Sequence, residues 1–314
     1  MIYTVTLNPA LDKTVEIDNF SVNEVNRVCT LRTDPGGKGI NVSKVLQSLG
    51  GSSTALGILA GKTGQEIQEA LEQMALCCDF TYVPGQTRTN LKIVDGLRHT
   101  NTDINEPGVA VEAEVLENML SALMAKLQPN DIVVLSGSVP VNAPKDLYRH
   151  WTEKCREKGA RVFLDADGEL LAQGLLGIPY LVKPNRDELS RLTKQPLDTV
   201  DALIAVGRQL QAQGICWVAI SLGADGAVFL HGDKVYRAQG ISVPVGSTVG
   251  AGDSMVAALA LGCEQEIADM QIIRLAMATS AANVMCSGSQ PASKAEVEQL
   301  LEKAVVTEYK KDVL

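Results

Sequence analysis

The sequence predicts an α/β protein of three layers, in which a mostly parallel central sheet lies between helices and a small separate β-sheet is inserted early in the chain. Two patterns support this prediction. In the second half, short and nearly continuous apolar runs alternate with amphipathic segments, which is typical of a parallel sheet covered on both faces. In the first half, segments rich in Thr, Val, Ile and Asn alternate polar and apolar residues without a helical period.

The first strand is expected at residues 2–7, a β-branched run that ends at Asn8-Pro9. Two helices are expected around residues 67–75 and 115–127, where apolar side chains recur at helical spacing. The small sheet is expected to form from residues 14–20, 26–33 and 87–105.

The rest of the chain alternates strands and helices. Further strands are expected at residues 131–135, 161–164, 180–182, 216–222, 227–230 and 234–237. Further helices are expected at residues 144–158, 200–213, 252–262, 268–285 and 293–305. Ligands of such folds bind at the carboxyl ends of the strands, so the small sheet is expected to act as a lid there. We therefore expect one domain, 1–314, whose lid comprises about residues 13–35 and 87–106.

Composition narrows the class of protein. The chain is 46% hydrophobic and 21% charged, which is ordinary for a globular enzyme and argues against disorder. Its net charge of −9 repels nucleic acid and anionic membranes, so neither is an expected partner. No signal-like start or apolar run of about 18 residues is present, which predicts a cytoplasmic protein. The seven scattered cysteines are interpreted as small buried residues in a reducing compartment.

The sharpest motif is Thr-Val-Gly-Ala-Gly-Asp-Ser at residues 248–254. Gly250 and Gly252 flank Ala251 just before a helix, where free amides and the helix dipole can bind the charge of a phosphoryl group in transfer. Asp253 in the first helical turn can accept the proton of an attacking hydroxyl. Alone, the motif fits a turn followed by a favourable first-turn charge equally well, and the other motifs shift the balance towards catalysis.

A second glycine-rich segment precedes an apolar helix that is expected to begin near Val42, and it contains Gly37, Lys38 and Asn41. We interpret it as a loop that grips hydroxyl and phosphate groups, although a plain turn with a solvated lysine is the commoner explanation of Gly-Gly-Lys alone. Asp12 follows the turn after the first strand and can accept from two sugar hydroxyls. Its place at the carboxyl end of a strand favours ligand contact over a surface turn.

Two later segments suit a nucleotide. Asn185 and Glu188 lie three residues apart, so they share one face of a helix that starts at Asn185 and could hold Mg²⁺-bound waters. A helix cap at Asn185 with a solvated Glu188 explains the pair as well. The turn at residues 221–226 lies between two expected strands and could pass its backbone along a nucleotide, though alone it is an ordinary turn.

Other site classes lack their signatures. Residues 57–63 have only three residues between the first glycine and Gly-Lys-Thr, one fewer than a phosphate loop requires. No Gly-x-Gly-x-x-Gly follows the first strand, which argues against a dehydrogenase. The three histidines, far apart in the chain, have no ligand-like spacing for zinc.

Four motifs in chain order give the chain a resemblance to the PfkB (ribokinase-like) carbohydrate kinases over essentially its whole length. They are Leu-Asn-Pro-Ala-Leu-Asp at 7–12, Gly-Gly-Lys-Gly-Ile-Asn at 36–41, Lys-Pro-Asn at 183–185 and Gly-Ala-Gly-Asp at 250–253. The resemblance implies a ribokinase-like fold and an enzyme that uses ATP and Mg²⁺ to phosphorylate a small sugar phosphate. It also implies a homodimer formed through the small sheet.

Residues 24–27, 87–90 and 102–105 resemble the branch of the family that acts on fructose 1-phosphate. That resemblance implies phosphorylation of the C6 hydroxyl, giving fructose 1,6-bisphosphate and ADP. Some relatives acting on a 6-phosphate have lysine in place of Asn26 and glycine in place of Lys38, whereas tagatose-6-phosphate kinases share the residues found here. Tagatose 6-phosphate and fructose 6-phosphate remain alternative substrates, and a non-catalytic sugar-phosphate sensor is the alternative from another class.

The resemblance also implies roles for individual residues. Asp253 is the expected base, and Gly250, Ala251 and Gly252 with Asp253 supply the amides of the anion hole. The expected contacts to the sugar phosphate, with Arg88 on its phosphate, are Asp12, Asn26, Gly37, Lys38, Asn41, Arg88 and Asp103. The expected ATP site comprises Lys183, Asn185, Ser221, Leu222, Gly223, Ala224, Asp225, Gly226, Gly252 and Asn283. Asn185 and Glu188 are expected to organise Mg²⁺.

Overall fold

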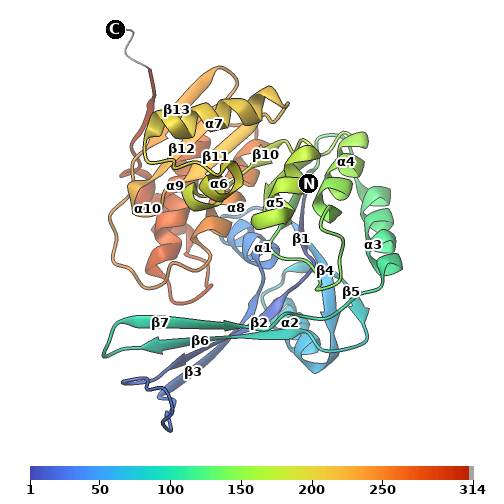
Figure 1. The fold of residues 1–314 in the computed structure, drawn as a ribbon, viewed down its shortest axis with the longest axis vertical. Coiled ribbons are helices and arrows are strands. Elements are labelled where there is room, and N and C mark those ends of the chain that lie inside the picture. The colour runs from blue at the N-terminus through green and yellow to red at the C-terminus, as the bar shows by residue number, and fades with distance from the viewer. Residues whose placement is uncertain (311–314) are drawn as a thin grey trace.

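The computed structural model describes residues 1–310, which form a large sheet, a small sheet and surrounding helices (Figure 1). The strands of the large sheet are β1 (Ile2–Thr6), β4 (Thr54–Ala60), β5 (Cys77–Val83), β8 (Ile132–Ser136), β9 (Arg161–Asp165), β10 (Leu181–Val182), β11 (Trp217–Ser221), β12 (Ala227–His231), β13 (Lys234–Ala238) and β14 (Val306–Glu308). Their order is β14-β13-β12-β11-β10-β9-β8-β1-β4-β5. Neighbours from β5 to β11 pair in parallel, and those from β11 to β14 pair antiparallel. The predicted mostly parallel sheet is confirmed.

Helices cover both faces of this sheet, which confirms the three layers. They are α1 (Lys38–Ser48), α2 (Gly61–Gln73), α3 (Ala113–Lys126), α4 (Leu147–Glu157), α5 (Gly168–Leu176), α6 (Arg186–Thr193), α7 (Val200–Ala212), α8 (Ala251–Glu264), α9 (Asp269–Met285) and α10 (Lys294–Leu301). Alternate residues of β8 point to opposite faces of the sheet and so to two separate cores. Val133 and Leu135 pack in the core formed with α3 to α7. Ile132 and Val134 pack in the core formed with α1, α8, α9 and α10. Among residues 1–310 no helix has the length and apolar character needed to span a membrane.

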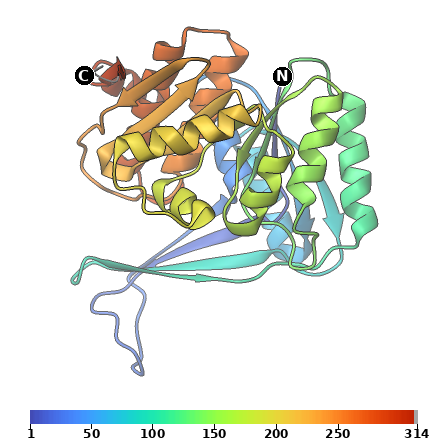
Figure 2. The same ribbon diagram turned by 45° about the horizontal axis from the view of Figure 1, so that its top comes forward.

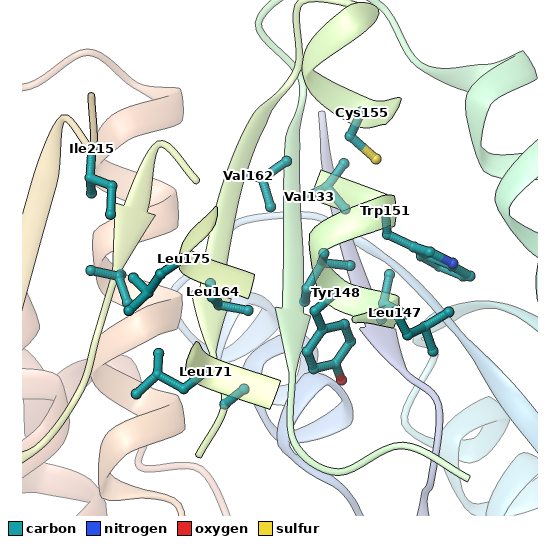
Figure 3. Close-up of a cluster of buried hydrophobic side chains, with 14 of the residues drawn as sticks. Val133, Leu147, Tyr148, Trp151, Cys155, Val162, Leu164, Leu171, Leu175 and Ile215 are labelled. Carbon is teal, nitrogen blue, oxygen red and sulfur yellow. The ribbon is translucent and has the colours of Figure 1, made fainter. Parts of the chain in front are cut away.

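Aromatic side chains of α4 anchor the core on one face of the sheet. Figure 3 shows Tyr148 and Trp151 of α4 beside Val133 of β8, with Val162 of β9 in the same cluster. Trp151 is fully buried, and truncating such a residue to alanine costs about 3–5 kcal/mol. The Tyr148 hydroxyl donates to the Ser136 carbonyl at 3.1 Å, so this core also fixes the carboxyl end of β8.

The small sheet comprises β2 (Ala10–Glu16), β3 (Thr30–Gly36), β6 (Arg88–Asp95) and β7 (Thr100–Asn105), in the order β3-β2-β6-β7. The chain leaves the large sheet after β1 to form β2 and β3, and again after β5 to form β6 and β7. Figures 1 and 2 show the small sheet extending away from the body, with the loop between β2 and β3 at its far end. The predicted small separate sheet is therefore present.

The two faces of the small sheet differ in chemistry. In the strand register, Asp12 of β2 lies opposite Asp34 of β3 and Asn90 of β6, which places three polar side chains on one face. The opposite face, which we call the outer face, carries the apolar side chains of Val15, Leu31, Leu91, Ile93 and Ile104. The polar face is the one that borders the site described below.

Several element boundaries differ from the predicted ones. Helix α1 begins at Lys38 rather than near Val42, because Gly37 takes a φ of 122° that turns the chain into the helix four residues earlier. Strand β2 begins at Ala10 rather than at Thr14, since pairing with β3 and β6 extends it back, so Asp12 lies within this strand. Long-range pairing decided both boundaries.

Strands β4 and β5 were not predicted. Gly57 interrupts the β4 pattern, yet the position needs a glycine, because an added Cβ would lie 2.3 Å from the Thr6 carbonyl oxygen. The interpretation of the cysteines as buried is wrong for Cys29, Cys77 and Cys216, which are exposed. Only Cys155 and Cys263 are fully buried, and all seven are free thiols.

Candidate active site

A cavity of about 850 Å³ lies at the carboxyl ends of the parallel strands and beside the polar face of the small sheet. Polar residues at or just after four strand ends line it: Asn8 after β1, Ser136 in β8, Lys183 after β10 and Ser221 in β11. This is the place where ligands bind in open α/β sheets. The cavity also brings together most of the predicted site residues, namely Asp12, Gly37, Lys38, Asn41, Arg88, Lys183, Asn185, Glu188, Ser221, Leu222, Gly223, Gly250, Gly252 and Asp253.

Asp253 lies in the first turn of α8 and is 6% exposed at the cavity wall. Asn41 Nδ2 donates a hydrogen bond of 2.8 Å to Asp253 Oδ2. Burial raises the pKa of Asp253 above its ordinary value, and the charge of Lys38 and the bond from Asn41 offset part of that increase. The result is a fixed carboxylate that is a somewhat stronger proton acceptor than an exposed aspartate.

The amides that precede Asp253 form a positively polarised edge of the cavity. Gly250 is the N-cap of α8 and has a φ of 80°, a left-handed conformation that favours glycine. A Cβ added at Gly252 would lie 3.2 Å from Lys183 Nζ, so the missing side chain leaves room between the helix end and the ammonium group. Free helical N–H groups beside a lysine suit a bound anion.

Two lysines of the cavity share one buried carboxylate. Asp165, the last residue of β9, lies 3.1 Å from Lys38 Nζ and 3.3 Å from Lys183 Nζ. Burial would raise the pKa of Asp165, but the charges of Lys183 and Lys38 lower it overall. Burial would lower the pKa of Lys38, and the charges of Asp165 and Asp253 raise it instead. Lys38 is therefore held in its charged form beside the cavity.

Asp12 and Arg88 border the cavity from the small sheet. Asn90 Nδ2 donates to Asp12 Oδ1 at 2.9 Å, and a Cβ added at Gly36 would lie 2.1 Å from Asp12 Oδ2. Burial raises the pKa of Asp12. Arg88 donates to the Asn8 carbonyl at 3.0 Å, and its buried Nε has no partner among residues 1–310. An oriented carboxylate and an incompletely paired guanidinium thus face the same space.

Asn185 and Glu188 form a helix cap at the cavity wall. The Asn185 side chain accepts from the Glu188 amide, and Glu188 Oε2 accepts from the Asn185 amide, both at 2.8 Å. Within the described part of the chain, Glu188 Oε1 has no hydrogen-bond partner, and no group of three or more His, Cys, Asp or Glu is arranged to hold a metal ion. The pair fits contact with a hydrated Mg²⁺, since one carboxylate oxygen remains free beside the cavity.

The turn after β11 borders the cavity only with its first residues. Gly223–Asp225 is a short 3-10 turn, and of the predicted residues 221–226 only Ser221, Leu222 and Gly223 line the cavity. Asp225 instead pairs with Arg186 at 3.2 Å. Gly226 packs so closely on β13 that an added Cβ would lie 2.1 Å from the Ala238 carbonyl oxygen. Ala224, Asp225 and Gly226 therefore fix the shape of the turn without lining the cavity.

Four further predicted residues lie outside the main cavity. Asn26 is in the loop between β2 and β3, where its side chain hydrogen-bonds the backbone of Ser21. It does not line the cavity of its own chain. Asp103 lines a smaller adjoining cavity of about 220 Å³ that shares Asp12 with the main one. Ala251 follows Gly250 in α8, and Asn283 Oδ1 lies close behind Gly250 without a partner among residues 1–310.

Sequence reasoning missed several cavity residues. They are Thr6, Asn8, Asn90, Asn105, Ser136, Gly137, Ser138, Ala166, Asp167, Arg186, Asp187 and Val249, with Asp165 behind them. A usable signal was present for Ser136 and Asp165, since each directly follows an apolar run that was predicted as a strand. Asn90 and Asn105 gave no such signal, because only the pairing of β6 with β2 and β7 turns them towards Asp12.

Comparisons with known proteins agree with this geometry. Residues 5–296 match the model of the pfkB family carbohydrate kinases. The chain is 36% identical to a 1-phosphofructokinase of Bacillus subtilis over 98% of this chain and 99% of that protein. It is 34% identical to a tagatose-6-phosphate kinase of Staphylococcus epidermidis over 91% of this chain and 92% of the relative.

A solved structure has the same fold. Phosphofructokinase-2 from Escherichia coli, in complex with substrates and products, superposes with a TM-score of 0.92 at 27% identity, covering 96% of this chain and 98% of that one. Sequence and structure agree over nearly the whole length. The chain belongs to the pfkB family of carbohydrate kinases.

Proposed function

We propose that the chain transfers the γ-phosphoryl group of ATP to the C6 hydroxyl of fructose 1-phosphate, giving fructose 1,6-bisphosphate and ADP. The class of reaction follows from family membership, since these proteins are sugar kinases that use ATP. Several relatives at 35–40% identity are 1-phosphofructokinases, which supports fructose 1-phosphate as the acceptor. The observation that carries the proposal is Asp253, buried at a helix N-terminus and open to the cavity.

The sugar phosphate binds at the end of the cavity next to the small sheet. Asp12, oriented by Asn90, accepts hydrogen bonds from sugar hydroxyls. The backbone at Gly37 and the side chains of Lys38 and Asn41 contact the sugar, and Arg88 binds its phosphate through its incompletely paired guanidinium. Asp103 contacts the sugar phosphate from the smaller adjoining cavity. Asn26 contacts a sugar phosphate only where the loop between β2 and β3 reaches the cavity of another chain.

ATP binds at the opposite end of the cavity. The backbone of Ser221, Leu222 and Gly223 borders the nucleotide, with Ala224, Asp225 and Gly226 holding the shape of that turn. Lys183 lies beside Gly252 and binds the phosphates. Asn283, behind Gly250, supports the anion hole from the other side. The γ-phosphoryl group then lies at the N-terminus of α8, next to Asp253.

Positioning and charge neutralisation carry the reaction. The amides of Gly250, Ala251, Gly252 and Asp253 bind the developing charge on the phosphoryl oxygens. Asp253 aligns the C6 hydroxyl and takes its proton as the bond to phosphorus forms. Mg²⁺, when bound near Asn185 and Glu188, supplies further positive charge to the phosphates.

The first experiment is a substrate panel with purified protein, ATP and Mg²⁺, comparing kcat/KM for fructose 1-phosphate, fructose 6-phosphate and tagatose 6-phosphate. Preference for fructose 1-phosphate is expected. Preference for tagatose 6-phosphate, which the relative at 34% identity makes the second candidate, would keep the mechanism and overturn the acceptor. Absence of turnover with all three would favour a sensor.

We further propose a homodimer formed through the outer face of the small sheet. On this face Leu31 and Ile104 are 61% and 52% exposed, and in the adjoining loop Val22, Val25 and Val28 are exposed as well. Large exposed apolar groups gathered in one region are typical of an interface. Light scattering should give a dimer for the native chain and a monomer for Leu31→Lys/Ile104→Lys; a native monomer would contradict the proposal.

The small sheet is also proposed to be the lid of a single kinase domain. Its polar face borders the cavity with Asp12, Asn90 and Asn105, so substrate binding would draw it towards the large sheet. Limited proteolysis of the loop between β2 and β3, with and without sugar phosphate and ADP, measures that change. We also propose that the protein acts in the cytoplasm, where ATP and sugar phosphates are available; cell fractionation tests this.

A further inference from the structure

Asp165 lies behind the cavity and reaches it only through two lysines. Its side chain is 2% exposed and does not line the cavity, whereas Lys38 and Lys183 both do. Oδ1 of Asp165 is 3.1 Å from Lys38 Nζ and 3.3 Å from Lys183 Nζ. One carboxylate oxygen therefore holds two ammonium groups.

The two lysines come from separate parts of the site. Lys38 begins α1 on the side assigned to the sugar phosphate, and Lys183 follows β10 on the side assigned to ATP. Two positive charges this close repel each other unless an anion lies between them. Asp165 is that anion, and its other oxygen, Oδ2, has no partner among residues 1–310.

A purely structural role explains this arrangement poorly. Burying an ion pair costs so much desolvation that it contributes little net stability in many proteins. Here the ammonium of Lys38 is also not sealed in the core, since its side chain is 37% exposed and faces the cavity. The buried carboxylate of Asp165 thus pairs with ammonium groups that face the ligand cavity.

We propose that Asp165 is a positioning residue for phosphoryl transfer: it holds the ammonium groups of Lys38 and Lys183 at a set separation, one on each side of the group in transfer. The negative charge that develops there meets two fixed positive charges, which need no rearrangement during the reaction. The proposal rests on the proposed function for the assignment of the two sides, but the geometry of the lysines can be tested without it.

The kinetic test uses Asp165→Asn, which keeps the size of the side chain and removes its charge. We expect kcat to fall about 100-fold, as for loss of one group that stabilises transferred charge. The KM values for ATP and sugar phosphate should change less than about threefold, because other residues bind the outer parts of both substrates.

A double-mutant cycle separates this role from a general loss of stability. If Asp165 acts through Lys38, Asp165→Asn should cost far less in a Lys38→Met background than in the native protein. Additive losses in kcat would contradict the proposal.

Asp131 provides the matched control. It is also a nearly buried carboxylate that pairs with an amine, the N-terminal group of Met1 at 3.1 Å, but it precedes β8 at the opposite edge of the sheet. Asp131→Asn should lower the melting temperature and leave kcat unchanged. If Asp131→Asn lowers kcat as much as Asp165→Asn does, the loss reflects stability and the positioning role is rejected.

Crystal structures of the native protein and Asp165→Asn test the geometry itself. Without the charge, Lys38 is expected to turn away from Lys183. If both ammonium groups keep their positions, the positioning role is wrong, whichever sugar phosphate the enzyme uses. If the native protein phosphorylates no sugar but Lys38 moves in the variant, the proposed function fails while the role of Asp165 in holding the lysines stands.

Discussion

Asn41 Nδ2 donates a 2.8 Å hydrogen bond to Asp253 Oδ2 across 212 positions of sequence. The bond joins α1 to the first turn of α8, so it fixes the carboxylate that we propose as the base relative to the proposed sugar-binding residues of α1. Asn41 Oδ1 is buried without a partner among residues 1–310 and borders the same cavity. One amide can therefore orient the base and remain available to a substrate hydroxyl.

Replacing Asp253 with asparagine should lower kcat by orders of magnitude without harming the fold. The loss in kcat is expected to be about 10² to 10⁴-fold, the usual contribution of a general base. Burial raises the pKa of Asp253, so at neutral pH its charge destabilises the folded state. Asp253→Asn should therefore melt at the same temperature as the native protein or higher. Near-normal kcat would remove Asp253 from the mechanism.

The acid side of the pH profile should report Asp253. Its protonated form cannot accept a proton, so kcat/KM should fall with a midpoint above the ordinary 3.8 of aspartate. The bond from Asn41 lowers the pKa of Asp253, and Asn41→Leu removes it. We expect the midpoint of Asn41→Leu to move to higher pH. A midpoint that stays in place would mean that another group titrates.

Gly252→Ala tests the anion hole. The new methyl would lie 3.2 Å from Lys183 Nζ and crowd the space assigned to the phosphoryl group, so kcat should fall by about 10² to 10³-fold. Alanine is the better helix former, so the melting temperature should not decrease. Gly96→Ala is the control. Gly96 lies in the turn between β6 and β7, where an added Cβ would be 3.7 Å from its nearest neighbour, Asp18 Oδ1, so kcat should not change. Normal kcat in Gly252→Ala would place the phosphoryl group elsewhere.

Lys44 should make stability depend on pH in the alkaline range. It is buried, donates to the Pro35 carbonyl at 3.0 Å, and burial lowers its pKa from 10.5 to about 8. Between these two values the unfolded chain holds a proton that the folded chain lacks, so the free energy of unfolding rises by about 1.4 kcal/mol per pH unit.

Denaturant unfolding of the native protein and Lys44→Met at about pH 7 and about pH 10 measures this effect. The native protein should gain stability relative to the variant as the pH rises. Because other groups titrate equally in both proteins, the difference isolates Lys44. A difference that does not change with pH would show that Lys44 keeps its charge throughout.

Much of the fold could be predicted because its signals are local. The apolar runs that became β8, β9 and β11 are short and nearly continuous, as a strand with two covered faces requires. The Gly-Ala-Gly-Asp motif is likewise local, because positive φ at Gly250 and a first-turn acid are properties of adjacent residues. The place of Asp253 in the first turn of a helix could therefore be predicted from sequence, together with the strand ends that line most of the cavity.

Only the tertiary structure decided which of these strand ends and helix starts meet. Periodicity tells which face of an element is buried, but it carries no information about its neighbours; β1 lies between β4 and β8, far apart in the chain. That order brings Asp165 to Lys38 and Lys183, and Asn41 to Asp253. The lysine partners of this buried aspartate have no signature in sequence, because they are set by packing between segments far apart in the chain.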